Sequence, residues 1–98
     1  MSYQYATSYP AYLEVRKGLG KRQRIVLEAI QTLTSHIRMP VNDREIAKFL
    51  SWPINTITNR RGELVKLGRI EEAYKKTDEV TGRKTSYWKV VDKQLSLL

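Results

Sequence analysis

The chain has 98 residues, enough for one domain with one modest hydrophobic core. Eighteen Lys and Arg residues against ten Asp and Glu residues give a net charge of +8 at pH 7, a balance that favours nucleic acid or an anionic membrane surface as partner. The chain has no cysteine, which excludes a disulfide scaffold, a thiolate metal site and a cysteine nucleophile.

The N-terminal segment is rich in tyrosine and leads into a basic link. Four tyrosines lie within residues 3–12, and residues 16–24 hold five positive charges and two glycines. This composition is compatible with a disordered arm, a strand packed on the body of the protein, or a dimerisation element. Since four tyrosines supply a large apolar surface, we expect this segment to be the candidate surface for a homodimer.

The first helix is expected at residues 21–37. Val26, Ile30, Leu33 and Ile37 recur at the spacing of one helical face, which predicts a buried stripe. The helix is expected to end before Pro40, because the residue that precedes a proline avoids the helical conformation. A short extended piece then follows.

The second helix, expected at residues 43–50, has the clearest local signal in the chain. Asn42 is a favourable N-cap, and Glu45 stands three residues later, as in a capping box. Val41 and Ile46 occupy the positions of a hydrophobic staple across this helix start.

The third helix is expected at residues 53–67, after a tight connection. Pro53 suits its opening because proline has no N–H to leave unpaired there, and Gly68 suits its left-handed end. The residues expected to face inward are Ile54, Ile57 and Leu64.

The first half of this helix is built from weak helix formers, and Gly62 in its middle costs about 1 kcal/mol relative to alanine. Asn55, Thr56 and Asn59 are expected to project outward, with Arg60 on the flank. Such residues at this place indicate contact with something outside the protein. The alternative is that Asn55 and Thr56 only cap the first helical turn.

Arg61 occupies a position that should face inward. Either its apolar stem packs at the edge of the core while its charged head reaches solvent, or the helix is rotated from this estimate. We favour the first interpretation.

Two strands rich in aromatic and β-branched residues are expected at residues 69–76 and 84–91, joined by a turn-rich loop that contains Gly82. They form a β-hairpin. We expect Trp88 to lie in the core and Trp52 to fill the gap between the second and third helices.

The order of elements predicts an α+β fold, a winged helix-turn-helix with a three-helix core and a β-hairpin wing. We expect the arm and basic link at residues 1–19, the folded domain at residues 20–91, and a tail at residues 92–98. A helix fits the major groove of B-form DNA, and the second helix of such a pair presents its N-terminal residues to base edges.

Two groups of residues are the candidate DNA contacts. Asparagine pairs with adenine, arginine with guanine, and a threonine methyl contacts thymine, so the base-reading candidates are Asn55, Thr56, Asn59 and Arg60. The wing residues expected on phosphates or in the minor groove are Lys75, Lys76, Arg83 and Lys84. The alternative for the wing is a solvated edge whose charge prevents sheet-edge pairing.

Enzyme chemistry is not indicated. His36 is the sole histidine, and its place near the end of the first helix is explained by the helix dipole. The sequence offers no Cys/His metal-ligand set, no phosphate-binding glycine loop and no paired nucleophile and base. We therefore expect no catalytic residue, no metal and no cofactor.

Residues 20–91 resemble the winged helix-turn-helix domains of MarR-type bacterial regulators and their small relatives encoded by phages. The matching residues are Glu45, Ile46, Ala47, Leu50, Ile57, Thr58, Leu64, Lys66, Leu67, Gly68 and Ile70. The resemblance implies that the four base-reading candidates contact DNA and that Arg83 and Lys84 lie on the wing. The chain departs from the pattern at Ser51, Pro53 and Arg61, and it lacks the long C-terminal helix through which full MarR proteins dimerise.

The function expected from the sequence is sequence-specific binding of double-stranded DNA by a transcriptional regulator. The alternatives are a winged-helix module that docks a protein, and an accessory DNA binder in phage or plasmid replication or recombination. No apolar run approaches the roughly 20 residues of a membrane span, and the N-terminus lacks a secretory signal. We therefore expect no membrane partner and a cytoplasmic location in a bacterial, archaeal or phage-infected cell.

Overall fold

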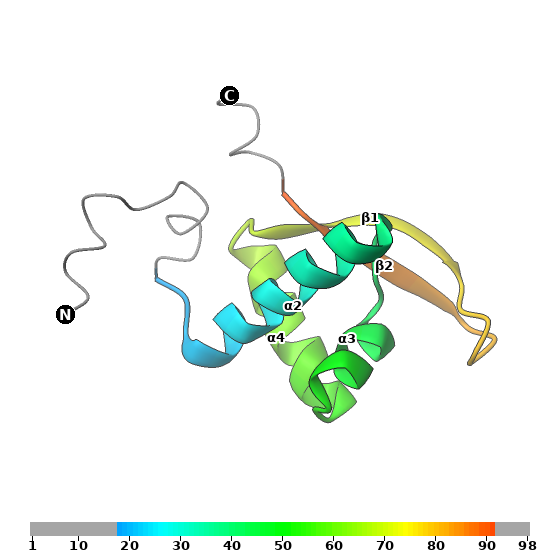
Figure 1. Ribbon diagram of the computed structural model, residues 1–98, viewed down its shortest axis with the longest axis horizontal. Coiled ribbons are helices and arrows are strands. Elements are labelled where there is room, and N and C mark those ends of the chain that lie inside the picture. The colour runs from blue at the N-terminus through cyan, green and yellow to red at the C-terminus, as the bar shows by residue number, and fades with distance from the viewer. Residues whose placement is uncertain (1–17, 92–98) are drawn as a thin grey trace.

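The computed structural model describes residues 18–91, which fold into three helices and one β-hairpin (Figure 1). The elements are α2 (Lys21–Ile37), α3 (Asp43–Leu50), α4 (Ile54–Lys66), β1 (Ile70–Thr77) and β2 (Lys84–Val90). This order confirms the predicted α+β winged helix-turn-helix fold. The Tyr-rich segment with its candidate dimer surface and the tail at residues 92–98 lie outside the described residues.

The middle of α2 packs on the core, while its last turn does not. Val26 and Ile30 are fully buried and Leu33 is partly buried, but Ile37 is 44% exposed. The prediction that Ile37 belongs to the buried stripe is therefore wrong, because the core lies against the middle of α2. The helix ends at Ile37, because the next residue, Arg38, adopts a left-handed backbone (φ 58°) that breaks the helix before Pro40 is reached.

The start of α3 confirms the predicted capping box. Asn42 Oδ1 accepts a hydrogen bond from the Glu45 N–H at 2.8 Å, and Glu45 Oε1 accepts one from the Asn42 N–H at 3.0 Å. These bonds satisfy N–H groups at the helix start that have no partner within the helix. The preceding Val41 pairs with Trp88 through two backbone hydrogen bonds, of 3.1 and 2.7 Å, so the predicted extended piece joins α3 to the hairpin.

The turn between α3 and α4 places Pro53 at the N-cap position, one residue before the helix begins. Ser51 closes α3 in the left-handed conformation (φ 58°), and Gly68 adopts φ 73° after α4, as predicted. Ile54 is 48% exposed, so the prediction that it faces inward is wrong. The helix starts at Ile54 itself, and the residues of α4 that reach the core are Ile57 and Leu64.

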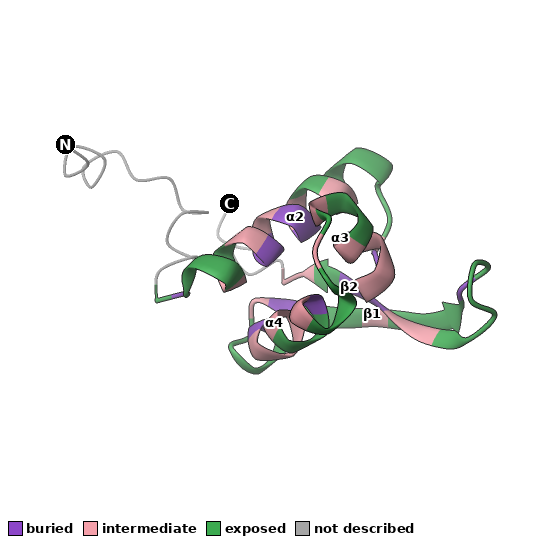
Figure 2. Ribbon diagram, turned by 90° about the horizontal axis from the view of Figure 1, so that it is seen from below, coloured by how far each residue is buried: buried purple, intermediate pink, exposed green. Residues whose placement is uncertain are grey.

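The core lies where the three helices face one another and the base of the hairpin (Figure 2). Ile57 and Leu64 of α4 meet Ile46 of α3 and Ile30 of α2, all with no exposed surface. Burying each such side chain contributes about 1.5–3 kcal/mol. Trp88 of the hairpin is 7% exposed and belongs to this core, which confirms its predicted place. Trp52 is partly buried and packs against the core.

The hairpin is antiparallel and extends beyond the helices, with its turn at one end of the molecule (Figure 1). Its register pairs Ile70 with Val90 at the base and Thr77 with Lys84 near the turn, with an irregularity between Glu72 and Tyr74. Because the base of the hairpin is anchored in the core, the rest of it is available as a wing.

Candidate nucleic-acid interface

The outward face of α4 carries polar side chains that have no partner among the described residues. Asn55, Asn59 and Lys66 are exposed, and none of them makes a hydrogen bond or ion pair with residues 18–91. Gly62 lies on the same face, three residues after Asn59 and four before Lys66. A Cβ atom placed on Gly62 would meet no described atom within 4 Å apart from the local helix backbone, so this face is open.

Thr56 and Arg60 lie on the side of α4 that faces α2. Thr56 is partly buried and lines a surface depression with Arg22, Trp52 and Pro53. Thr56 is therefore placed apart from Asn55 and Asn59, although all three were predicted as one base-reading group.

Arg60 is held in place within the chain. Its Nη2 lies 2.9 Å from Glu63 Oε2, and Glu63 Oε1 accepts a hydrogen bond from Gln23 Nε2 of α2 at 2.8 Å. The side chain is 28% exposed, and its buried Nε has no hydrogen-bond partner. A guanine contact by Arg60 stays a prediction, and such a contact would compete with Glu63 for the guanidinium.

Arg61 points inward and is fixed between two helices and a strand. Its Nε and Nη2 donate to Asp43 Oδ1 and Oδ2 of α3 at 3.0 and 2.8 Å, and its guanidinium lies 4.3 Å from the centre of the Trp88 ring. The expectation that the charged head reaches solvent is wrong, because Asp43 and Trp88 together hold it at the core edge. Thr58 adds a third hydrogen bond to Asp43 at 3.0 Å.

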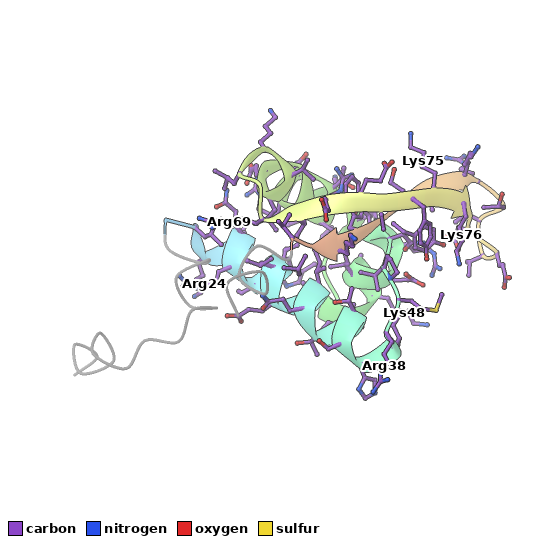
Figure 3. The ribbon with its side chains drawn as sticks, turned by 90° about the horizontal axis from the view of Figure 1, so that it is seen from above. Arg24, Arg38, Lys48, Arg69, Lys75 and Lys76 are labelled. Carbon is purple, nitrogen blue, oxygen red and sulfur yellow. The ribbon has the colours of Figure 1, made fainter. Side chains whose placement is uncertain are left out.

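The four predicted wing cations are exposed, and the three that belong to the strands lie on two faces of the hairpin. Lys75 pairs with Ser86 and Thr77 with Lys84, so Lys75 and Lys84 share one face. Lys76 lies on the opposite face, and Figure 3 shows the side chains of Lys75 and Lys76 pointing to different sides of the hairpin. The Lys76 Nζ lies 5.0 Å from the centre of the Tyr87 ring. Lys75 and Lys84 can therefore contact one polyanion together, and Lys76 reaches a different side.

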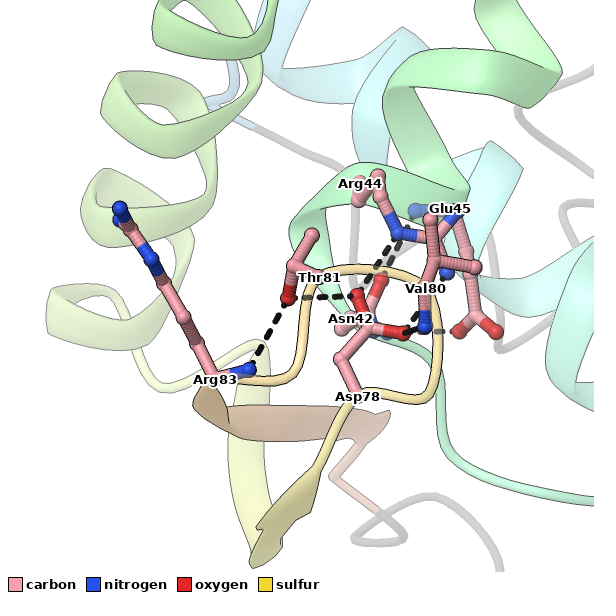
Figure 4. Close-up of polar contacts among 7 residues, drawn as sticks. All are labelled: Asn42, Arg44, Glu45, Asp78, Val80, Thr81 and Arg83. Atoms are coloured by element: carbon pink, nitrogen blue, oxygen red, sulfur yellow. Dashed lines mark hydrogen bonds and ion pairs between the residues drawn. The ribbon is translucent and has the colours of Figure 1, made fainter.

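An ion pair between Arg44 of α3 and Asp78 of the hairpin turn fixes the wing (Figure 4). Arg44 Nε and Nη2 donate to Asp78 Oδ2 and Oδ1 at 2.8 and 3.0 Å, and the Asp78 side chain is only 7% exposed. The hydrogen bonds from Arg44 lower the pKa of the Asp78 carboxyl, against the opposing effect of its burial. The same contact raises the pKa of Arg44.

Asp78 also organises the turn that carries Arg83. Its Oδ1 accepts from the Val80 N–H at 3.2 Å, and its backbone N–H donates to the Arg83 carbonyl at 2.9 Å. The sequence reasoning missed this role, because Arg44 and Asp78 are 34 positions apart. The available signal was an aspartate opening a turn, where its side chain can accept a backbone N–H two residues later.

Two further findings concern metal ligands and membrane spans in the described part of the chain. Within residues 18–91 no three His, Cys, Asp or Glu side chains come together as metal ligands would. Over the same residues, no helix is both long enough and apolar enough to span a membrane.

Comparison with known proteins shows the fold. No protein-family model matches the sequence, and no curated protein matches it significantly. Among solved structures, the chain is similar to a single-site mutant of MepR from S. aureus, with 17% sequence identity and a TM-score of 0.55. The match covers 99% of this chain and 72% of the MepR chain. At this identity the similarity establishes a winged helix like that of MepR.

Proposed function

We propose that this chain is a sequence-specific double-stranded DNA-binding protein that acts as a transcriptional regulator. The observation that carries the proposal is the open outward face of α4, where Asn55 and Asn59 have no partner within the described residues. Asparagine pairs bidentately with adenine in the major groove, and Lys66 on the same face suits a phosphate. The winged-helix fold, which the chain shares with MepR, supports the same conclusion.

The wing supplies the second contact in this proposal. Lys75 and Lys84 share one face of the hairpin, and Arg83 precedes β2 at the turn. Their charges would lie along the phosphates or the minor groove beside the segment entered by α4. The Arg44–Asp78 ion pair fixes the angle between this wing and the helices, so the two contacts are presented together.

The test is selection of bound duplexes from a random pool, followed by a salt titration on the selected sequence. We expect one preferred sequence and an affinity that falls steeply with salt, because each phosphate contact releases counterions. A flat salt response with no preferred sequence would contradict the proposal and favour a protein-docking module instead. A steep salt response without a preferred sequence would remove sequence specificity and favour an accessory DNA binder.

Homodimerisation through residues 3–12 remains part of the proposal. A single winged helix of this size contacts few base pairs and discriminates poorly among genomic sites. Two copies would double the contacted sequence. Light scattering on the full chain, with and without the selected duplex, is expected to show a dimer on DNA, and a monomer in both conditions would contradict this.

A further inference from the structure

The first turn of α2 carries a group of cations that the proposed interface does not use. Lys21, Arg22 and Arg24 are all exposed, and this turn holds no acidic residue. None of the three makes an ion pair with a residue of the described segment 18–91. By contrast, Arg44, Arg60 and Arg61 each have a carboxylate partner. The α2 cations are therefore available to a partner outside the fold.

The position of Arg22 indicates which partner this is. Arg22 borders the same surface depression as Trp52, Pro53 and Thr56, which are the residues of the turn into α4 and of its first helical turn. Arg22 thus lies beside the N-terminal end of α4, which would enter the major groove. The start of α2 and the turn of the hairpin lie at opposite ends of the described fold (Figure 1).

The arrangement is unfavourable for the isolated helix. A cation in the first turn opposes the helix dipole, whose positive end lies at the N-terminus of the helix. Gln23, the remaining polar residue of this turn, already binds the Gly20 N–H at 2.9 Å and Glu63 at 2.8 Å. No described group therefore offsets the charges of Lys21 and Arg22, whereas an approaching phosphate would do so.

We propose that the first turn of α2 is a second phosphate-binding surface, in which Arg22, with Lys21 beside it, binds the DNA backbone next to the segment read by α4. The wing would bind the duplex at one end of α4, and the first turn of α2 would bind it at the other end. The inference rests on the proposed DNA-binding function and adds a contact that the sequence analysis did not include among its candidates.

The test compares two substitutions that remove the same charge from opposite ends of one helix. In Arg22→Gln the proposed phosphate contact is lost, so the slope of log affinity against log salt should become shallower by about 0.9. Arg38→Gln, at the far end of α2, should leave the slope as it is in the unmodified chain (Figure 3). The preferred sequence should be the same for both variants, since phosphate contacts carry no sequence information.

Each other outcome overturns the inference in a distinguishable way. If Arg22→Gln has the same salt slope as Arg38→Gln while the unmodified chain binds its duplex, the first turn of α2 does not bind phosphate. The proposed function then stands without this surface. If Arg22→Gln changes the preferred sequence, Arg22 contacts a base and the phosphate role is wrong. If the unmodified chain shows no salt-dependent duplex binding, both the inference and the proposed function fail.

Discussion

The two sides of α4 carry similar polar residues in very different surroundings. On the side that faces α3, Thr58 and Arg61 converge on Asp43, and Arg61 also lies over Trp88. On the outward side, Asn55 and Asn59 are exposed and have no partner within the described residues. One helix therefore uses its polar residues for two purposes.

The difference shows that a poor helix-forming sequence can be stable when one of its sides is fixed by tertiary contacts. The bidentate Arg61–Asp43 pair connects α4 to α3, and Ile57 and Leu64 bury the same side of the helix. Tertiary packing outweighs intrinsic propensity in most protein helices. The outward side is thus free to carry residues chosen for contact with another molecule.

The largest expected effect comes from breaking the inner side. Asp43→Ala would leave the partly buried Arg61 guanidinium without its carboxylate, which should lower the free energy of unfolding by about 2–3 kcal/mol. Urea unfolding measures this. Glu63→Ala is the matched control, because Glu63 pairs with Arg60 but its side chain is 40% exposed, against 17% for Asp43. The control should cost less than about 1 kcal/mol. Equal losses in the two variants would contradict the structural role of the inner side.

A second prediction separates stability from binding on the outer side. Gly62→Ala should raise the free energy of unfolding by about 1 kcal/mol, because alanine favours the helix and the new Cβ meets no described atom beyond the local helix backbone. The same methyl group stands on the face that would approach DNA, so duplex binding should weaken severalfold. Thr32→Ala, at an exposed position of α2, should stabilise the helix slightly without changing binding. A Gly62→Ala protein that binds as tightly as the unmodified chain would show that DNA does not approach this face closely.

The smallest expected effect concerns the Arg44–Asp78 ion pair and depends on pH. Folding lowers the pKa of Asp78, so its stabilising effect is complete above the ordinary aspartate pKa of about 3.9 and is lost as pH falls through the folded value. Asp78→Asn should therefore lower the melting temperature at neutral pH and lose this difference from the unmodified chain in acid. Thermal unfolding at several pH values measures it. A difference between the two proteins that is constant from neutral to acid pH would contradict this role of the charge.

Some features of this fold are predictable because their causes are local. The capping box at Asn42 and Glu45, the glycine that ends α4 and the turn before Pro53 each depend on a few neighbouring residues. Together with the apolar period of the first helix and the two aromatic and β-branched runs, these features predict the order of three helices and a hairpin. Ile37 and Ile54 were misplaced because helical periodicity gives a direction around the helix and does not give the extent of the core along it.

The candidate site depends on contacts between distant positions, which the sequence pattern does not contain. The inward position of Arg61 follows from its spacing to Ile57, but its partners Asp43 and Trp88 come from two other elements. The pairs of Arg44 with Asp78 and of Glu63 with Gln23 likewise connect separate elements. The exposed Asn55 and Asn59 were predictable, because their outward direction requires only the helical period.

The most direct test of the DNA-binding account is a backbone amide NMR titration of the full chain with its selected duplex. We predict large shift changes for Asn55, Asn59 and Gly62 on the outer side of α4, and for Arg83 and Lys84 on the wing. Amides in the second half of α2, such as Thr32 and Ser35, should not shift. Changes centred on that half of α2, with the α4 and wing amides unmoved, would contradict the account.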